Sequence, residues 1–563
     1  MPRRGKPRRR SGRAATIGAV PVQRREAQRL DRQEMLNRVL GRTSPWDMVI
    51  IGGGATGVGA AVDAAARGYE ILLLEQSDFG KGTSSRSTKL VHGGVRYLEQ
   101  GNVSLVMEAL RERGILRQNA PHLVSDLAFV VPRYDWWEAP FYGVGLKIYD
   151  LLAGKYGFGA SQLLSREETL ARLPTIRREG LRGGVVYYDG QFDDSRLLIN
   201  LVQTAAEHGA TVLNYAPVTQ LIKGADGFVQ GVVARDLEAG TELRAAARVV
   251  INAAGPFCDA IRRMAEPDAV PMIAPSQGVH LVFERSFLPG NSAIMVPHTA
   301  DGRVMFAIPW HGHTVVGTTD TPITDPSLEP RPLPEEINFV LETAGQYLHH
   351  APGRNDVLSV FVGIRPLVKS GDASSTAALS RDHTIRIDDS GLLTIAGGKW
   401  TTYRHMAEDC INQAATWARL PEVPCPTLNL RIHGYADKPP GAGSLASYGS
   451  DAAAIEALVK EDASLGRSLH PALTYRGVEV VWAVREEMSR TVEDVLARRT
   501  RALFLNARAA SEMAPQVAAI MAKELALGDD WKARQVQAFQ ELASKYLVSP
   551  VAGGAMGEPG GES

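Results

Sequence analysis

Residues 48–75 read MVIIGGGATGVGAAVDAAARGYEILLLE, and this stretch decides the fold. The apolar run at 48–51 is typical of a buried strand, and the alanine-rich run after the glycines predicts a helix. A second apolar run at 71–74 predicts another buried strand, which ends in Glu75. A strand, a glycine-rich turn, a helix and a second strand in this order predict a βαβ unit with a parallel sheet.

Three glycines follow the first strand with the spacing G-x-G-x-x-G, and Glu75 comes 23 positions after the first of them, Gly52. Gly52 permits a tight turn, Gly54 lets the backbone approach a pyrophosphate at the helix N-terminus, and Gly57 allows close helix–strand packing. Glu75 would accept hydrogen bonds from ribose hydroxyls. The unit predicts dinucleotide binding and does not by itself separate NAD from FAD.

Two later parts of the chain favour FAD. The segments TVLNYAPVTQLI (211–222) and RVVINAAGPF (248–257) predict strands whose small residues let the backbone come close to a cofactor, and Val218, Ala254 and Gly255 are candidates there. From residue 392, LLTIAGGKWTTYRHMAE predicts a strand, a glycine turn and a helix. The N-terminus of that helix would face a flavin ring and stabilise negative charge at its N1–C2=O edge. The candidates in this turn are Gly398, Lys399, Trp400 and Thr401.

The polar stretch TSSRSTKLVHGGVRYLE, residues 83–99, comes directly after the βαβ unit. Its hydroxyls are expected to donate to pyrophosphate and ribityl oxygens, and the candidates are Thr83, Ser84, Ser85 and Ser87. Lys89 would add positive charge, and His92 is assigned to flavin packing. Gly93 and Gly94 would let the backbone pass close to the flavin.

The chain of 563 residues is too long for a single hydrophobic core. Lys+Arg and Asp+Glu both number 62, so the net charge predicts no nucleic-acid partner. Cys258, Cys410 and Cys425 have the spacing of neither a zinc site nor a disulfide framework, which predicts a reducing compartment. No run approaches the roughly 18 apolar residues that span a bilayer, so any membrane contact is expected to be peripheral.

Composition and periodicity also predict the organisation of the chain. We expect a basic, disordered tail over 1–44, a cofactor- and substrate-binding region over 45–435, a helical domain over 436–548, and a flexible tail over 549–563. The substrate parts are expected at about 131–190 and 263–384. The aromatic stretch YDWWEAPFYGVGLKIYDLLAGKYGFG, residues 134–159, predicts core packing, with a lipid contact as the alternative reading.

Several motifs resemble one family, the FAD-dependent glycerol-3-phosphate dehydrogenases of the aerobic, respiratory type. They are VIIGGGATGVGAAVDAAARG, TSSRSTKLVHGGVRYLE, INAAGP, FAIPWHGHTVVGTTDTP, VGIRPL, SRDHTI and AGGKWTTYRHMAE. The resemblance implies an α/β fold, in which a Rossmann-like FAD-binding domain is interleaved with an α+β substrate (cap) domain of the glycine/D-amino acid oxidase type. An all-α C-terminal domain completes the fold that it implies.

The resemblance also implies a reaction. sn-Glycerol 3-phosphate is oxidised to dihydroxyacetone phosphate, hydride passes to FAD N5, and electrons continue to a membrane quinone. The implied location is the cytoplasm, with peripheral attachment to the cytoplasmic face of the plasma membrane, and homodimers are common in the family. After the helical region the sequence shows no D-x-[DN]-x-[DN]-G loop, so we expect no calcium site, and no metal ligands are predicted.

Site residues are carried over by the same resemblance. Arg96, Tyr97 and Lys399 are expected to hold the substrate phosphate or nearby oxygens, and Arg365 and Arg381 to line the substrate pocket. An arginine fork suits a phosphate because it binds two oxygens at once. His280 is the expected general base, acting beside Arg365 and Lys399, and His311 is a weaker candidate. Thr318, Thr319 and Asp320 are expected to shape the sheet near the flavin.

Three alternatives stay open at this stage. The first is a glycerophosphate oxidase that uses O2 and makes peroxide, since the residues alone do not fix the electron acceptor. The second is an amine or amino acid oxidase of the same fold, whose pocket needs one arginine for a carboxylate and no cluster of cations. The third is a flavin-binding protein without enzymatic activity.

Overall fold

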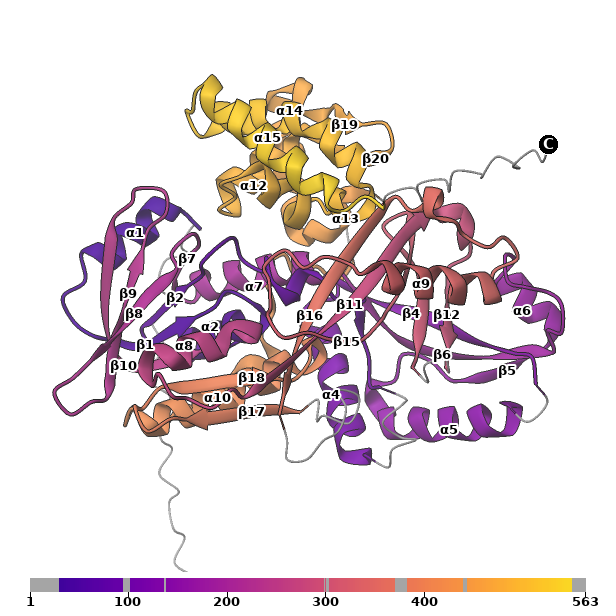
Figure 1. Cartoon of the computed structure of the whole chain (residues 1–563), viewed down its shortest axis with the longest axis horizontal. Coiled ribbons are helices and arrows are strands. Elements are labelled where there is room, and N and C mark those ends of the chain that lie inside the picture. Colours follow the sequence, from indigo (N-terminus) through magenta and orange to yellow (C-terminus); the bar gives the residue numbers. More distant parts are fainter. Residues whose placement is uncertain are drawn as a thin grey trace, which may run out of the picture.

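The computed structural model describes residues 30–94, 102–135, 138–297, 299, 303–369, 382–438 and 443–548. Figure 1 shows two parts built around β-sheets, side by side, and a helical domain above them. Among the described residues, no helix combines the length and the apolar character that crossing a membrane requires.

The first sheet contains the predicted βαβ unit at its centre. Strands β1 and β2 pair in parallel, with Met48 opposite Ile71, and β10 pairs in parallel with β1 on its other side. All residues of β2 are buried, as expected for a strand covered on both faces. The order is β17 (His383–Ile387), β18 (Leu393–Gly397), β10 (Glu242–Asn252), β1 (Trp46–Ile51), β2 (Ile71–Leu74) and β7 (Thr211–Leu213), with β8 (Val218–Lys223) and β9 (Val229–Arg235) added antiparallel to β10.

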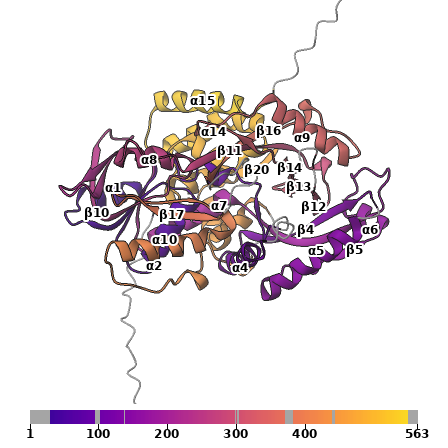
Figure 2. The ribbon, with the colours of Figure 1, turned by 60° about the horizontal axis from the view of Figure 1, so that its bottom comes forward.

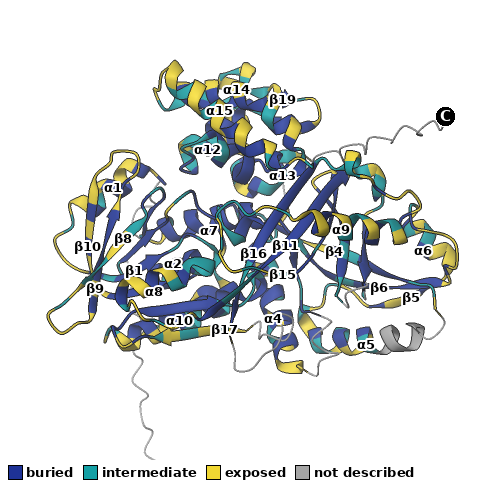
Figure 3. Ribbon diagram, viewed as in Figure 1, coloured by how far each residue is buried: buried dark blue, intermediate teal, exposed yellow. Residues whose placement is uncertain are grey.

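Helices cover this sheet and close its core. The buried side chains of the strands form one cluster with apolar residues of four helices, which are α1 (Arg32–Leu40), α2 (Ala55–Ala66), α7 (Asp194–Glu207) and α10 (Tyr403–Trp417). The buried strands and the inward helix faces are dark blue in Figure 3. This core fixes the carboxyl edge of the parallel strands, where ligands bind in open α/β sheets.

The second sheet is mixed and larger. Its order is β15 (Thr321–Pro322), β11 (Ile273–Glu284), β14 (His313–Gly317), β13 (Met305–Trp310), β12 (Ser292–Val296), β4 (Val124–Arg133), β6 (Gly183–Phe192) and β3 (Leu90–Val91). β16 (Ser359–Val368) pairs with β11, and β5 (Gln162–Leu164) pairs with β6. α6 (Arg166–Arg172) and α9 (Pro334–Tyr347) lie on this part, as do α4 (Val103–Asn119) and α5 (Glu138–Ala153), whereas α8 (Cys258–Ala265) follows β10.

The helical domain follows these sheets in the chain. It contains α11 (Ala452–Glu461), α12 (Gly477–Glu486), the π-helix η11 (Asp494–Arg499), α13 (Ala502–Leu505), α14 (Ala507–Glu524) and α15 (Asp529–Ser544). It also holds a two-stranded hairpin, β19 (Ser468–His470) and β20 (Leu473–Arg476), which the all-α expectation missed. Strands this short show too little alternation to be recognised from sequence.

The predicted N-terminal tail is wrong near its end, because α1 is an ordered helix. Asp31 caps α1 by accepting a hydrogen bond from the Glu34 N–H, and Met35 and Val39 are buried in the core of the first sheet. Arg32 is buried against Asp236, with 2.6 Å between Nη2 and the carboxylate. The dense charge around residues 24–38 concealed the apolar stripe in the sequence.

The second sheet also begins earlier than the expected substrate segment. β4 starts at Val124, whereas that segment was expected from about 131. The aromatic stretch that follows is divided in the structure. Tyr149 is buried, and its hydroxyl donates to Asp189 at 2.6 Å, so this part of the stretch packs in the core.

Candidate active site

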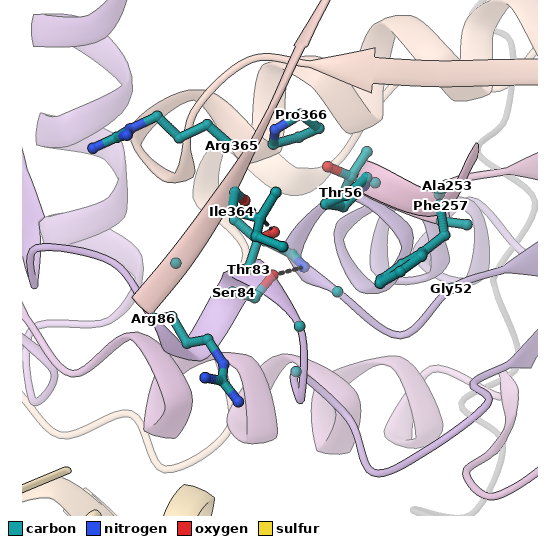
Figure 4. A pocket seen from close by; sticks show the side chains of 18 of the residues that line it. Gly52, Thr56, Thr83, Ser84, Arg86, Ala253, Phe257, Ile364, Arg365 and Pro366 are labelled. Atoms are coloured by element: carbon teal, nitrogen blue, oxygen red, sulfur yellow. Dashed lines mark hydrogen bonds between the residues drawn. The ribbon is translucent and has the colours of Figure 1, made fainter. Parts of the chain in front are cut away.

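One cavity of about 500 Å³ lies at the carboxyl edge of the first sheet, where β11 and β16 of the second sheet close it. Its wall runs from the glycine-rich turn after β1, past residues 80–92, to side chains on β11 and β16 and to the turn after β18. Figure 4 shows Thr83 and Ser84 in this wall, between Ile364 of β16 and the turn at Gly52. The cavity therefore joins the predicted cofactor residues to the predicted substrate residues.

The glycine-rich turn has the geometry that the sequence predicts. Gly52 has φ +115°, a conformation that side chains rarely adopt. A Cβ at Gly57 would lie 2.0 Å from the carbonyl oxygen of Gly52, so only glycine lets α2 pack this closely against the strand. Gly54 caps α2 without a side-chain hydrogen bond, and the helix N-terminus borders the cavity. Such a terminus favours a phosphate group.

Glu75 lies at the expected place, at the end of β2 and in the cavity wall. Its carboxylate accepts hydrogen bonds from the Gly53 N–H at 2.6 Å and from the Ser77 N–H at 2.9 Å. Burial raises the pKa of Glu75, and these two hydrogen bonds oppose the rise. The two backbone contacts hold the carboxylate at the position where a ribose hydroxyl would donate to it.

Several residues of the polar stretch line the cavity as predicted. Thr83, Ser84, Ser87 and His92 all do so. The Ser84 Oγ accepts from the Ala55 N–H at 2.9 Å, which leaves its own proton to donate to a ligand. The Thr83 hydroxyl donates to the Ile364 carbonyl at 2.6 Å, and the Ser87 hydroxyl donates to Asp194 at 2.7 Å. Their protons are therefore already committed within the protein.

Four predicted cofactor residues of this stretch do not line the cavity. Ser85 and Lys89 are buried and do not line the cavity. The Lys89 ammonium donates to Asp194 at 2.7 Å. Burial lowers the pKa of Lys89 to about 7, and Asp194 opposes this shift. The Gly93 N–H donates to the Tyr149 hydroxyl at 2.8 Å, and Gly94 also lies outside the cavity wall. Ser85 and Lys89 thus have polar partners within the protein, and the cofactor contacts of these four residues stay predictions.

The other segments predicted to meet FAD do reach the cavity. Its wall includes Val218, Ala254 and Gly255 from one side, and Gly398, Lys399, Trp400 and Thr401 from the turn after β18. The Trp400 indole donates to the Ser84 carbonyl at 2.8 Å, and Thr401 accepts from the His92 N–H at 3.2 Å. These two contacts join the turn after β18 to the polar stretch, so both segments line the same cavity.

Arg365 reaches the cavity from β16. Its guanidinium donates to Asp320 at 3.2 Å, to the Thr318 hydroxyl at 3.2 Å and to the Thr319 carbonyl at 3.0 Å. A Cβ at Gly278 would lie 2.5 Å from Nη2 of Arg365. Because glycine has no side chain, the guanidinium can pack against β11 at this position. The residues expected to shape the sheet, Thr318 to Asp320, thus hold the arginine, which keeps 23% of its side chain exposed.

His280 also lines the cavity, from β11. Its Nε2 lies 2.9 Å from the Thr88 hydroxyl, and its ring stacks on Phe361 with 4.7 Å between centroids. Burial, with help from the charges of Lys89 and Arg365, lowers the pKa of His280 well below its ordinary 6.5. Nδ1 makes no hydrogen bond within the described part of the chain. Because its pKa is low, the imidazole is neutral and has a ring nitrogen that can accept a proton.

Four other predicted residues remain, and the structure describes one of them. Arg96, Tyr97 and Arg381 lie outside the described residues. His311 lies in the turn between β13 and β14, where its Nε2 is 2.9 Å from Asp193, and it does not line the cavity. Of the two predicted bases, His280 is therefore the one that lines the cavity.

Sequence reasoning missed several apolar residues of the wall. They are Phe257, Ile261 and Met264 near α8, Phe306 on β13 and Leu328. Arg86 also borders the cavity, and its guanidinium pairs with Glu329 at 2.9 Å. The amphipathic pattern of α8 was visible in the sequence, but which apolar residues face a ligand depends on tertiary packing.

The residues present fit FAD. The Cβ atoms absent at Gly52 and Gly57 leave the space for a closely packed phosphate turn, and Glu75 and Ser84 supply an acceptor and a donor along one wall. Farther along the same cavity, His280 and Arg365 can meet a small anionic substrate. The arrangement can bind a dinucleotide and place an alcohol or amine beside its reactive ring.

Comparison with known families agrees with this geometry. Residues 47–404 match the family model of FAD dependent oxidoreductases. Residues 395–534 match the model described as the C-terminal domain of alpha-glycerophosphate oxidase.

Individual proteins extend the similarity. The mitochondrial glycerol-3-phosphate dehydrogenase of Rattus norvegicus is 39% identical over 568 residues, which cover 95% of this chain and 77% of the relative. The corresponding protein of Arabidopsis thaliana is 42% identical, with coverage of 90% and 86%. The structure of the Bacillus halodurans glycerol-3-phosphate dehydrogenase, complexed with FAD, is 30% identical with a TM-score of 0.75 and covers 92% of this chain and 98% of that chain. The L-alpha-glycerophosphate oxidase of Mycoplasma pneumoniae shares the fold at 17% identity, with a TM-score of 0.53 and coverage of 69% and 98%.

Proposed function

The chain belongs to the FAD-dependent glycerol-3-phosphate dehydrogenase family, and from this premise we propose that it oxidises sn-glycerol 3-phosphate to dihydroxyacetone phosphate. Bound FAD, the cofactor of this family, would supply the acceptor for the hydride that leaves the substrate carbon. The observation that carries the proposal is one cavity that joins the glycine-rich turn at Gly52 to Arg365, Lys399 and His280.

Phosphate recognition falls to the cations at the far end of the cavity. Arg365 binds the substrate phosphate there, because its orientation is fixed by Asp320 and Thr318 before any ligand arrives. A guanidinium held in advance loses little side-chain entropy when it binds an anion. Lys399, in the same wall, supplies a second charge. Arg96, Tyr97 and Arg381 are further candidates on the basis of the resemblance.

Proton removal falls to His280. Its ring is neutral, so it can accept the proton of the substrate hydroxyl while hydride leaves the same carbon. The charge of Arg365 contributes to the low pKa of His280. A bound phosphate dianion beside Arg365 would offset that charge, so the imidazole becomes more basic when the substrate is present.

The same cations bear on the alternatives. A carboxylate substrate needs one arginine, whereas a phosphate dianion is better matched by Arg365 and Lys399 together. This favours a phosphorylated alcohol over an amino acid. The glycerophosphate oxidase reading differs only in the electron acceptor, and the similarity of residues 395–534 to an oxidase C-terminal domain keeps it as the second candidate.

We further propose that the electrons pass to a membrane quinone and that the protein docks peripherally through α4 and α5. These helices are in contact, and Figures 1 and 2 both show them side by side at one edge. Leu151 is 80% exposed, and Met107, Ile148 and Val103 are 51%, 48% and 43% exposed on the same helices. Exposed apolar side chains beside lysines are typical of helices that lie in a membrane interface. The cytoplasmic face of the plasma membrane is the proposed location.

A vesicle assay tests the acceptor and the docking surface together. Flavin reduced by sn-glycerol 3-phosphate should be reoxidised faster by quinone in anionic lipid vesicles than by O2. Leu151→Glu should slow reoxidation by vesicle quinone about tenfold, because burying one leucine contributes about 1.5–3 kcal/mol, and should leave reoxidation by a water-soluble quinone unchanged.

The matched control is Val270→Glu, which charges a valine that is 73% exposed in the connection between α8 and β11. Equal slowing by both substitutions would reject this docking surface. Faster reoxidation by O2 than by quinone would favour the oxidase.

A further inference from the structure

The segment between Glu75 and Leu90 has two sides. Its inner side lines the cavity, through Lys81, Thr83 and Ser84 among others. Its outer side carries Asp78 and Ser85, which are buried and face the helical domain. FAD binding accounts for the inner side alone, so the contacts of the outer side require a separate explanation.

Asp78 is the first contact with the helical domain. Its carboxylate accepts hydrogen bonds from Arg498 and from Arg499, whose Nη1 and Nη2 lie at 2.7 and 3.0 Å. Burial would raise the pKa of Asp78, but the two guanidinium groups hold it at about 2. Lys81 also contacts the helical domain, because its ammonium lies 2.9 Å from the carboxylate of Glu493.

Ser85 is another residue of this segment that contacts the helical domain. Its carbonyl oxygen accepts from Arg501 Nη2 at 2.6 Å and from Lys89 Nζ at 2.9 Å. Arg501 also lies 3.3 Å from Asp194, the carboxylate that Lys89 contacts at 2.7 Å. Two charged donors on one carbonyl fix the backbone there, because charge-assisted hydrogen bonds are the stronger kind. The buried Lys89 therefore holds the Ser85 carbonyl together with Arg501.

The backbone that presents these arginines is unusual. Arg498 and Arg499 end the π-helix η11, and Arg501 has φ +67°, although it is not glycine. π-helical turns and left-handed non-glycine residues cluster at functional sites and persist where the surroundings hold them. In Figure 1, α13, which follows Arg501, lies at the base of the helical domain above β16. We call residues 498–501 the arginine turn.

The path from this turn to the cavity is short. Ser85 follows Ser84 in the 3-10 helix η1 (Thr83–Ser85), and the Ser84 Oγ contacts the first turn of α2 through the Ala55 N–H at 2.9 Å. The Ser84 carbonyl also accepts from the Trp400 indole at 2.8 Å. A shift of the Ser85 carbonyl would therefore move the cofactor-facing hydroxyl and loosen both contacts.

We propose that the arginine turn of the helical domain positions the segment 78–89 for FAD, with Arg501 and Arg499 as positioning residues. The helical domain is then part of the cofactor site although it does not line the cavity within the described residues. By linkage, bound FAD stabilises the docking of the helical domain on the first sheet. The inference depends on FAD as cofactor and is independent of the substrate.

Titration of apoprotein with FAD tests this role in the full-length chain. Binding is followed by tryptophan fluorescence, because Trp400 lines the cavity. Arg501→Lys keeps the charge but loses the guanidinium geometry, and the Kd for FAD should rise about tenfold, as expected for one lost charged hydrogen bond. Arg499→Lys should change the Kd in the same direction, and it replaces Arg501→Lys if that variant does not fold.

The control is Arg490→Lys. Arg490 pairs with Glu238 at 2.7 Å through both Nε and Nη2, so it also joins the helical domain to the first sheet, but away from segment 78–89. The proposal expects an unchanged Kd for this variant and similar melting temperatures for all the apoproteins. An unchanged Kd in both arginine-turn variants, or an equal rise in Arg490→Lys, would overturn it. So would a rise in Kd that only accompanies a lower melting temperature of the apoprotein.

Discussion

Replacing Arg365 by alanine is expected to lower kcat/KM for sn-glycerol 3-phosphate by about 10²- to 10³-fold, because a buried charge pair with the phosphate is lost. The loss is increased by Asp320, whose carboxylate lies 3.2 Å from Nη1 of Arg365 in the native protein. Without the arginine, this carboxylate would repel the dianion. Arg365→Lys keeps a positive charge beside Asp320 and should therefore lose less activity than Arg365→Ala.

The FAD content of the purified variant separates substrate binding from structure. It should stay at the native level in Arg365→Ala, since the cofactor contacts at Gly52, Glu75 and Ser84 are left intact. Arg386→Ala is the control, because Arg386 of β17 pairs with Asp388 at 2.6 Å and does not line the cavity. A parallel loss of FAD and activity in Arg365→Ala would show that the residue is structural.

Replacing His280 by asparagine is expected to slow flavin reduction by about 10²- to 10⁴-fold, the usual contribution of a general base. Rapid mixing of the FAD-loaded variant with sn-glycerol 3-phosphate in the absence of O2 measures this rate directly. His313→Asn is the matched control, because His313 is a buried histidine on the neighbouring strand β14 and does not line the cavity. An unchanged reduction rate in His280→Asn would remove His280 as the base.

The pH dependence of the native reaction follows from the same histidine. Its pKa lies well below 6.5 in the free protein, so the ring is already neutral at pH 6.5 and needs no deprotonation above it. As the pH falls, His280 becomes protonated, and the reaction slows, only at a pH well below 6.5. Because the bound phosphate offsets the charge of Arg365, the pKa of His280 should be higher in the substrate complex than in the free protein. The fall of kcat at acid pH should therefore begin at a higher pH than the fall of kcat/KM.

The strong sequence signals concerned local structure. The order of strand, glycines, helix and acid in residues 48–75 identified the cofactor unit, since each position has a backbone reason that the structure confirms at Gly52 and Gly57. The turn at Gly398 to Thr401 was also found, because its helix start is visible in the sequence. These features depend on neighbours in the chain, which a sequence displays directly.

The sequence indicated only weakly which partner each polar side chain faces in the folded protein. Ser85 and Lys89 have the residue types of a phosphate site, but their partners, Arg501 and Asp194, lie far away in the chain. Similarly, α1 was hidden because its buried arginine pairs with Asp236, a contact that no local pattern announces. A polar residue can face a ligand or a buried countercharge, and only the fold decides between them.

Anaerobic titration of the FAD-loaded protein with sn-glycerol 3-phosphate, followed through the absorbance of the flavin, tests the central claim most directly. The account predicts that the oxidised flavin absorbance is lost with the phosphorylated alcohol, that dihydroxyacetone phosphate forms in equal amount, and that glycerol lacking the phosphate has no such effect. A flavin that stays oxidised at saturating sn-glycerol 3-phosphate would contradict the account.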